Sequence, residues 1–142
     1  IYEAQASIQP LFDKKHVTLT IHCEIEPTVM LLIEPKSISN ALIAILENAL
    51  EVSQENQQVQ IHAKLDGTKV NILISDQGPG IPAQMLDSLF EPFSTTHANG
   101  TGLGLSIAKN SLEAHRGNIS VQSSSAGAQF TLAIPYLQHQ SN

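Results

Sequence analysis

The feature that most constrains the fold is a pair of segments in which apolar and polar residues alternate, joined by the short sequence DGTK. The apolar residues are Val59, Ile61, Ala63 and Leu65 in the first segment and Val70, Ile72 and Ile74 in the second. A period of two residues indicates strands that bury one face, and the short link predicts an antiparallel hairpin. By the same period, the strand over 70–76 directs Asp76 toward the buried face.

The remaining periodicity predicts a sheet with helices on one of its faces. Apolar residues recur at helical spacing in the opening residues, in 35–53 and in 103–116, where Gly117 is the expected C′ glycine. Further strands are predicted over 17–25, 29–33, 119–122 and 130–134. The long loop from 77 to about 102 is typical of a lid or binding loop. We expect the α/β class: a two-layer sandwich with a mixed sheet of about five or more strands, about three helices on one face, and a long lid.

Composition and charge exclude several classes of protein. The 142-residue chain is 42% hydrophobic and 14% charged, which indicates one globular domain rather than a disordered segment. Thirteen acidic residues outnumber seven basic ones, the net charge is -6, and no Lys/Arg cluster is present to bind a nucleic-acid backbone. No run approaches the roughly 18 apolar residues of a membrane span, and a single cysteine, Cys23, excludes an intrachain disulfide. We expect a cytoplasmic segment without nucleic-acid or membrane contact.

Asp76 is a polar residue that the core pattern does not explain. A buried, ionised carboxylate costs roughly several kcal/mol of stability unless hydrogen-bond donors reach it. The exocyclic amine of a purine is one such donor, and Gly78 and Gly80 would let a flat ring approach the backbone without Cβ atoms in the way. The alternative is an ordinary turn in which Asp76 accepts backbone N–H bonds.

Asn48 lies at the rim of the apolar stripe of the helix predicted over 35–53. A residue at the rim reaches past the core into a cavity. An amide oxygen in that position suits Mg²⁺, which prefers oxygen ligands. The alternative is an ordinary asparagine on the helix surface.

Three alternating glycines, Gly100, Gly102 and Gly104, precede the helix predicted over 103–116. Free backbone N–H groups at a helix N-terminus bind phosphate oxygens, and the helix dipole favours anions there. The spacing matches neither the Walker motif nor a dinucleotide fingerprint. The alternative is a flexible loop that ends in a helix cap.

The order of these features along the chain resembles the ATP-binding catalytic domain of sensor histidine kinases, in particular the nitrogen-regulation-like subgroup. AILENALEVS is similar to the N box, DQGPGIP to the G1 box, LFEPFSTT to the F box and lid, GTGLGLSIAK to the G2 box, and AGAQFTLAIP to the last glycine motif and strand. The resemblance covers about residues 5 to 136. It places the chain in the wider group of gyrase, heat-shock chaperone, histidine kinase and mismatch-repair ATPases.

The resemblance implies a binding site for ATP and Mg²⁺. Asp76 would bond the adenine amine, and Asn48 would coordinate the Mg²⁺ and act with Glu47 in catalysis. The residues that would shape the base pocket, anchor the lid or cover the triphosphate are Gly78, Gly80, Phe90, Phe93, Gly100, Gly102 and Gly104. Further nucleotide contacts would come from Glu51, Ile81, Thr95, Thr96, His97, Thr101, Leu103, Leu105 and Thr131.

The sequence departs from the family pattern at three positions. Ala44 stands where the chaperone and gyrase ATPases carry the Glu that activates water, and because alanine takes no proton, transfer to a protein side chain is favoured over hydrolysis. Glu51 replaces a Lys of many relatives, and His97 replaces a lid Lys. An imidazole has an ordinary pKa of about 6.5, so we hypothesise that His97 touches the γ-phosphate and makes affinity rise on acidification. The alternative is a solvated lid histidine.

In the family that the chain resembles, the phosphoacceptor histidine is followed by an acidic residue and, further on, by a proline. None of the six histidines of this chain is followed by this pattern, and no Cys/His metal cluster is evident along the sequence. His22 and His62 lie out of phase with the apolar residues of their strands, which indicates surface side chains rather than metal ligands.

We therefore expect a piece of a longer protein. Residues 1–15 would be a helical lead-in from a dimerisation and phosphoacceptor hairpin outside this chain, 16–136 the catalytic domain, and 137–142 a polar tail. The implied activity is transfer of the γ-phosphate of Mg-ATP to a histidine of that hairpin, with a response regulator as the downstream partner. Two alternatives stay open: an ATP-driven clamp or ATPase of the same fold, and a non-catalytic interaction module with a decayed pocket.

Overall fold

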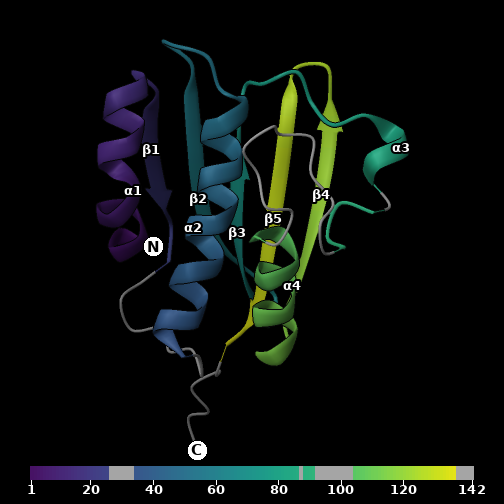
Figure 1. Cartoon of the computed structure of the whole chain (residues 1–142). Helices are drawn as coiled ribbons and strands as arrows, with labels where there is room; N and C mark the ends of the chain where they lie inside the picture. The colour runs from purple at the N-terminus through teal and green to yellow at the C-terminus, as the bar shows by residue number, and fades with distance from the viewer. Residues whose placement is uncertain (26–33, 87, 92–103, 137–142) are drawn as a thin grey trace, which may run out of the picture.

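The computed structural model describes residues 1–25, 34–86, 88–91 and 104–136, and it shows a five-stranded sheet with helices packed on one face (Figure 1). The strands are β1 (Thr18–Cys23), β2 (Gln58–Asp66), β3 (Lys69–Ser75), β4 (Asn118–Ser124) and β5 (Gly127–Pro135). The helices are α1 (Tyr2–Lys15), α2 (Pro35–Val52), α3 (Ala83–Leu86) and α4 (Gly104–Ala114). None of these described helices is long and apolar enough to cross a membrane.

The sheet is mixed, with the strand order β1-β2-β3-β5-β4. β1 pairs parallel to β2, and the other neighbours pair antiparallel. A parallel pair needs a crossover connection, and α2 lies in the chain between β1 and β2. The predicted hairpin is confirmed as β2 and β3, whereas the strand predicted over 29–33 lies outside the described residues. The arrangement confirms the predicted two-layer α/β class.

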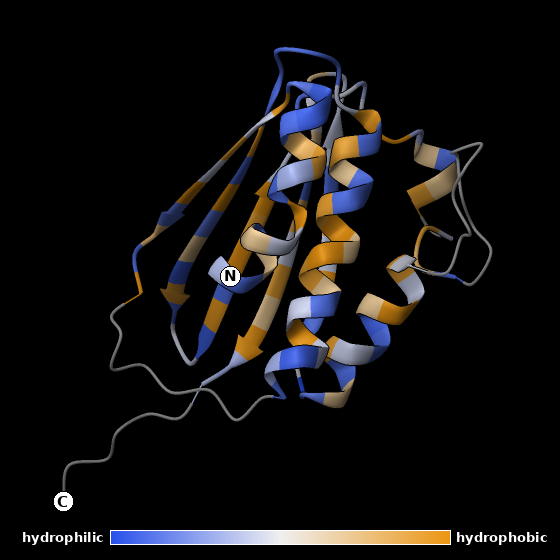
Figure 2. Cartoon of the chain, turned by 60° about the vertical axis from the view of Figure 1, so that its left-hand side comes forward, coloured by the Kyte–Doolittle hydropathy of each residue, from blue (hydrophilic) through white to orange (hydrophobic). Residues whose placement is uncertain are grey.

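Only one face of the sheet carries the core. Along β5 every second residue, from Ala128 to Ile134, is buried, and β3 shows the same alternation. In β2 the alternation holds as far as Ala63, whereas Leu65, predicted on the buried face, is 40% exposed. Figure 2 shows the corresponding hydrophobic and hydrophilic bands along the strands. In Figure 1, α1, α2 and α4 lie on one side of the sheet, and the buried side chains of α2 are those that the helical period predicts: Ile38, Ala41, Leu42, Ile45, Leu46 and Ala49.

Helix α1 belongs to the same core. Its buried residues are Ala4, Ile8 and Phe12, and Phe12 has no exposed surface. The helix ends at His16, which takes the left-handed conformation at φ 61°, and the N–H of Val17 then donates to the carbonyl of Phe12 at 3.0 Å. The segment predicted as a lead-in is therefore packed into the domain that follows it.

The end of α4 differs from the prediction in its capping residue. We expected Gly117 to take the left-handed conformation, but Arg116 takes it, at φ 62°. Gly117 instead donates its N–H to the carbonyl of Leu112 at 2.8 Å, and a Cβ there would lie 2.2 Å from the carbonyl oxygen of Ala133. Close approach to β5, rather than a positive φ, explains glycine at this position.

Replacing Phe12 tests whether α1 is an integral part of the core. Phe12→Ala should lower the free energy of unfolding by about 3–5 kcal/mol, because it removes a fully buried ring and leaves a cavity. Urea denaturation followed by circular dichroism measures the change. Leu11→Ala, one residue earlier and 49% exposed, is the matched control and should cost less than about 1 kcal/mol. Equal, small losses from both substitutions would show that α1 does not pack on the sheet.

Candidate functional site

A cavity of about 740 Å³ opens between the C-terminal half of α2, the turn that follows β3, and the β4–β5 turn. Its described lining residues are Asn48, Glu51, Val52, Gln54, Asp76, Pro79, Gly80, Ile81, Pro82, Leu89, Ser123, Ser124, Ser125 and Ala128. The described lining combines an apolar wall with two carboxylates, Glu51 and Asp76, and two amides, Asn48 and Gln54. The structure thus brings together Asn48, Glu51, Asp76, Gly80 and Ile81, which the sequence analysis assigned to one site.

Asp76 continues the buried face of β3 past the end of the strand, and only 8% of its surface is exposed. Its Oδ1 accepts a hydrogen bond from the N–H of Gly78 at 2.9 Å and another from the N–H of Ala128 at 3.2 Å. Its own N–H donates to the carbonyl of Ala128 at 3.0 Å. The turn interpretation is therefore correct about these backbone bonds, and the same carboxylate also lines the cavity.

The glycines of this turn are explained by contacts within the protein. A Cβ on Gly80 would lie 2.0 Å from the carbonyl oxygen of Ser124, and Gly80 also has φ +85°. A Cβ on Gly78 would lie 3.0 Å from both Cγ2 and the carbonyl oxygen of Val52. We expected these glycines to admit a flat ring. The structure shows instead that the space of each missing side chain is taken by α2 or by the β4–β5 turn.

Ser123 and Gly127 are site residues that the sequence analysis missed. The hydroxyl of Ser123 accepts the N–H of Ile81 at 2.6 Å and so holds the turn after β3 against β4. Gly127 has φ +142°, and a Cβ there would lie 2.1 Å from the carbonyl oxygen of Asp76. The glycine at the start of AGAQFTLAIP was the available signal for the second contact, whereas nothing in the run of serines distinguishes Ser123 from its neighbours.

Helix α2 presents one face to the cavity. Asn48, Glu51 and Val52 are three and four residues apart and therefore lie on the same side of the helix, where all three line the cavity. Asn48 is half-buried and Glu51 is exposed. Glu47 is also exposed but is not among the lining residues. The assignment of Glu47 to catalysis therefore stays a prediction.

The remaining described predictions lie at the margins of the site or away from it. Phe90 packs edge-on against Phe130, with ring centroids 6.2 Å apart, which attaches the segment after α3 to the core. Gly104 begins α4, followed by the half-buried Leu105, and a Cβ on Gly104 would lie 3.7 Å from that of Ala44.

Thr131 does not reach the cavity. Its neighbours Phe130 and Leu132 are both fully buried under the helices. Because side chains alternate along a strand, Thr131 projects from the opposite face of the sheet. Its pairing partners across the sheet are Leu73 and Ser120. The prediction of a nucleotide contact from this residue therefore disagrees with the structure.

The remaining predicted residues lie outside the described part of the chain: Phe93, Thr95, Thr96, His97, Gly100, Thr101, Gly102 and Leu103.

The comparisons with known proteins agree with this fold. Residues 33–138 match the family described as histidine kinase-, DNA gyrase B-, and HSP90-like ATPase. The match covers most of the chain, including α2, the turn after β3 and α4. The chain belongs to this family, which is a family of ATP-binding domains.

Within the family, the similar proteins are sensor histidine kinases. The chain is 37% identical over 103 residues to the sensor histidine kinase ZraS of Escherichia coli K12, covering 72% of this chain and 22% of that protein. It is 31% identical over 134 residues to the sensory histidine kinase/phosphatase NtrB of Vibrio alginolyticus, covering 85% and 38%. The chain therefore spans well under half the length of these relatives. The solved catalytic domain of histidine kinase ThkA superposes with a TM-score of 0.85 at 29% identity, over 94% of this chain and 88% of that one.

Substituting Gly80 tests the close packing of the turn after β3 against the β4–β5 turn. Gly80→Ala combines a left-handed residue with a steric overlap on Ser124. Gly67→Ala is the matched control, because Gly67 has a similar φ of +62° and nothing within 4 Å of its missing Cβ. The control should cost about 1–2 kcal/mol for backbone strain, and Gly80→Ala should cost about 1–3 kcal/mol more through overpacking. Urea denaturation measures both, and equal losses would contradict the contact.

Proposed function

We propose that this chain binds Mg-ATP in the cavity beside α2 and donates the γ-phosphate to a histidine on a dimerisation hairpin, as the catalytic domain of a two-component sensor kinase. The observation that carries the proposal is the position of Asp76. A carboxylate fixed by two backbone N–H groups lines a cavity whose volume lies within the roughly 300–1,000 Å³ typical of small-molecule sites. Membership of an ATPase family then favours a nucleotide as the ligand.

Adenine recognition follows from the acceptor chemistry of Asp76. An ionised carboxylate only accepts hydrogen bonds, so its partner in the cavity must be a donor, and the exocyclic amine of adenine is one. Two protein bonds already fix the orientation of the carboxylate, which lowers the cost of binding because little remains to be ordered. Apolar residues Val52, Ile81 and Leu89 line the same cavity and suit the faces of a purine ring.

The charge of the cavity favours a divalent cation with the triphosphate. Its described lining residues include the carboxylates of Glu51 and Asp76 and no Lys or Arg. A polyanion would be repelled there unless a cation accompanied it. Asn48 and Glu51 offer an amide oxygen and a carboxylate from one face of α2, and these are the ligand types that Mg²⁺ prefers. We propose that Asn48 holds the Mg²⁺ and that Glu51 contributes directly or through water.

Phosphoryl transfer to a protein side chain is favoured over hydrolysis. Catalysis of this reaction depends mainly on positioning the phosphates and neutralising their charge. Hydrolysis by the route of the related ATPases needs a carboxylate base, and Ala44 at that position of α2 takes no proton. The chain would therefore position the nucleotide and leave the nucleophile to the acceptor hairpin.

We also propose a response regulator as the downstream partner, and the cytoplasm as the location of the domain. The structure of histidine kinase ThkA in complex with response regulator protein TrrA superposes on this chain with a TM-score of 0.81 at 27% identity, over 96% of this chain and 39% of that one. A kinase domain of this kind works where ATP and the regulator are both present.

Asp76→Asn separates the structural role of this residue from its role in adenine recognition. The amide oxygen can accept the N–H groups of Gly78 and Ala128, but the amide nitrogen is a donor and opposes an adenine amine. The free energy of unfolding should change little. A hydrogen bond to a charged acceptor contributes about 1.5–3 kcal/mol of binding free energy. Its loss should weaken ATP binding about 10- to 150-fold, as measured by calorimetry.

Inosine triphosphate is the control ligand for this substitution, because it carries a carbonyl where ATP carries the amine. The original chain should prefer ATP, and Asp76→Asn should abolish or reverse that preference. Unchanged ATP affinity in a folded Asp76→Asn protein would sink the proposed binding mode.

The phosphotransfer itself is tested by mixing the chain with Mg-ATP and a separately produced phosphoacceptor hairpin. Acid-labile phosphohistidine should appear on the hairpin, and replacing the acceptor histidine with Gln should abolish it. Asn48→Asp retains oxygen ligands whereas Asn48→Leu removes them, so we expect more transfer with the first variant than with the second.

Two other outcomes would identify a different function. Steady ATP hydrolysis by the chain alone, without label on the hairpin, would indicate an ATP-driven clamp of the same fold. Absence of any thermal shift with Mg-ADP, where ligand at about 100 times its dissociation constant should add about 2.7 kcal/mol, would indicate an interaction module without a working pocket.

A further inference from the structure

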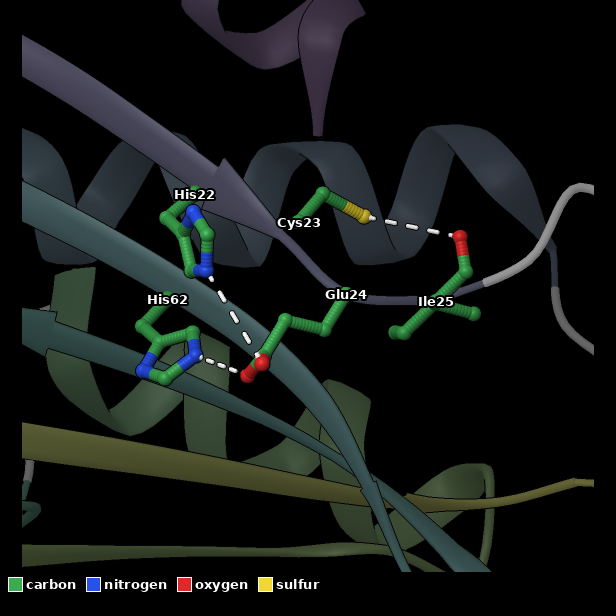
Figure 3. A network of polar contacts seen from close by, with 5 residues as sticks. All are labelled: His22, Cys23, Glu24, Ile25 and His62. Atoms are coloured by element: carbon green, nitrogen blue, oxygen red, sulfur yellow. Dashed lines mark hydrogen bonds and ion pairs between the residues drawn. The ribbon is translucent and has the colours of Figure 1, made fainter.

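Three side chains with metal-binding atoms converge on the face of the sheet that the helices leave open. They are His22 and Glu24, at the end of β1 and just after it, and His62 on β2 (Figure 3). One ligand atom from each lies within 4.8 Å of the other two. The cluster uses none of the residues of the cavity beside α2.

The pairing of β1 with β2 creates this cluster. The two strands run parallel in a register that places His22 opposite His62. The N–H of Glu24 donates to the carbonyl of Ala63 at 2.8 Å, which extends the ladder one residue beyond β1. Because alternate residues of a strand share a face, Glu24 projects on the same side as His22. His22 and Glu24, two residues apart at the end of β1, are thus placed beside His62 on β2.

The side chains are already oriented toward one another. In Figure 3 dashed lines join the Glu24 carboxylate to both imidazole rings. Its Oε2 contacts Nε2 of His62, and its Oε1 lies 3.9 Å from Nε2 of His22. The ring centroids of the two histidines are 5.0 Å apart.

We propose that His22, Glu24 and His62 form a binding site for a divalent transition metal, with Zn²⁺ as the preferred ion. Two imidazoles and one carboxylate are a common zinc ligand set, completed by water at the fourth position of a tetrahedron. The hard cation Mg²⁺ prefers a site made only of oxygen ligands. The metal would tie the end of the edge strand β1 to β2.

Only side-chain rotation is needed to complete the site. Zinc bonds of about 2.0–2.1 Å in a tetrahedron place ligand atoms roughly 3.3 Å apart. The ligand atoms lie within 4.8 Å of one another, so no pair has to approach by more than roughly 1.5 Å. The side chains of His22, Glu24 and His62 are 73%, 51% and 40% exposed, so no core packing opposes this movement. Lys64 lies two residues after His62 on β2, and therefore on the same face of the sheet, where its positive charge opposes a bound cation.

The test is a zinc titration of the chelator-treated chain, followed by calorimetry and by the imidazole resonances in NMR. One Zn²⁺ should bind per chain, excess Mg²⁺ should not compete, and the ring signals of His22 and His62 should shift while that of His16 does not. His22→Gln, Glu24→Gln and His62→Gln should each weaken zinc binding at least about tenfold, since even outer-shell changes commonly cost that much. Lys64→Gln should strengthen it.

His16→Asn is the matched control. It removes an imidazole just before β1, at a left-handed position that Asn tolerates, and should leave zinc binding unchanged. Urea midpoints in chelator should be equal for the original chain and the three ligand variants, and zinc should raise the midpoint of the original chain alone. Zinc binding that is absent, or that survives all three ligand substitutions, would show that Glu24 forms only a surface ion pair with the histidines. Nucleotide binding is measured separately, so either proposal can fail without the other.

Discussion

A single carboxylate oxygen, Oδ1 of Asp76, connects the parts from which the cavity is built. It accepts the N–H of Gly78 from the turn after β3 and the N–H of Ala128 from β5. Gly127 brings the backbone of the β4–β5 turn against Asp76 so closely that no side chain fits between them. Asp76 therefore has two roles: its backbone contacts shape the wall of the cavity, and its carboxylate lines the interior of the cavity. The proposed recognition of a nucleotide depends on both of these roles of Asp76.

The sheet separates two kinds of chemistry. On the helix-covered face, an apolar core ends at a cavity with a fixed carboxylate and an asparagine on α2. On the open face, near β1, three side chains bring metal-ligating atoms within 4.8 Å of one another. A binding event on one face need not disturb the other, because the buried layer of β2 and β3 lies between them.

Sequence periodicity was sufficient for most of the core and for the direction of Asp76, because both depend on the local geometry of helices and strands. It was wrong for Leu65, which lies near the exposed end of the β2–β3 hairpin. It was insufficient where a residue is explained by a contact with a distant segment. Gly117 fitted a capping rule, but its actual constraint is the carbonyl of Ala133 on β5. Gly80 fitted a ligand-access argument, but the backbone of Ser124 occupies that space. The Thr131 assignment followed a motif and overlooked that neighbouring residues of a strand face opposite sides.

The sequence by itself determined the class of fold, the buried faces of its elements and the group of residues around Asp76 and Asn48, because hydrophobic period and motif order are written along the chain. Only the tertiary structure decided which strands became neighbours and in what register. That register brings His62 beside His22 and Glu24, although 38 residues separate His62 from Glu24. The phase of the two histidines predicted surface side chains rather than metal ligands. Their proximity depends on the parallel pairing of β1 with β2, a long-range contact that no local pattern encodes.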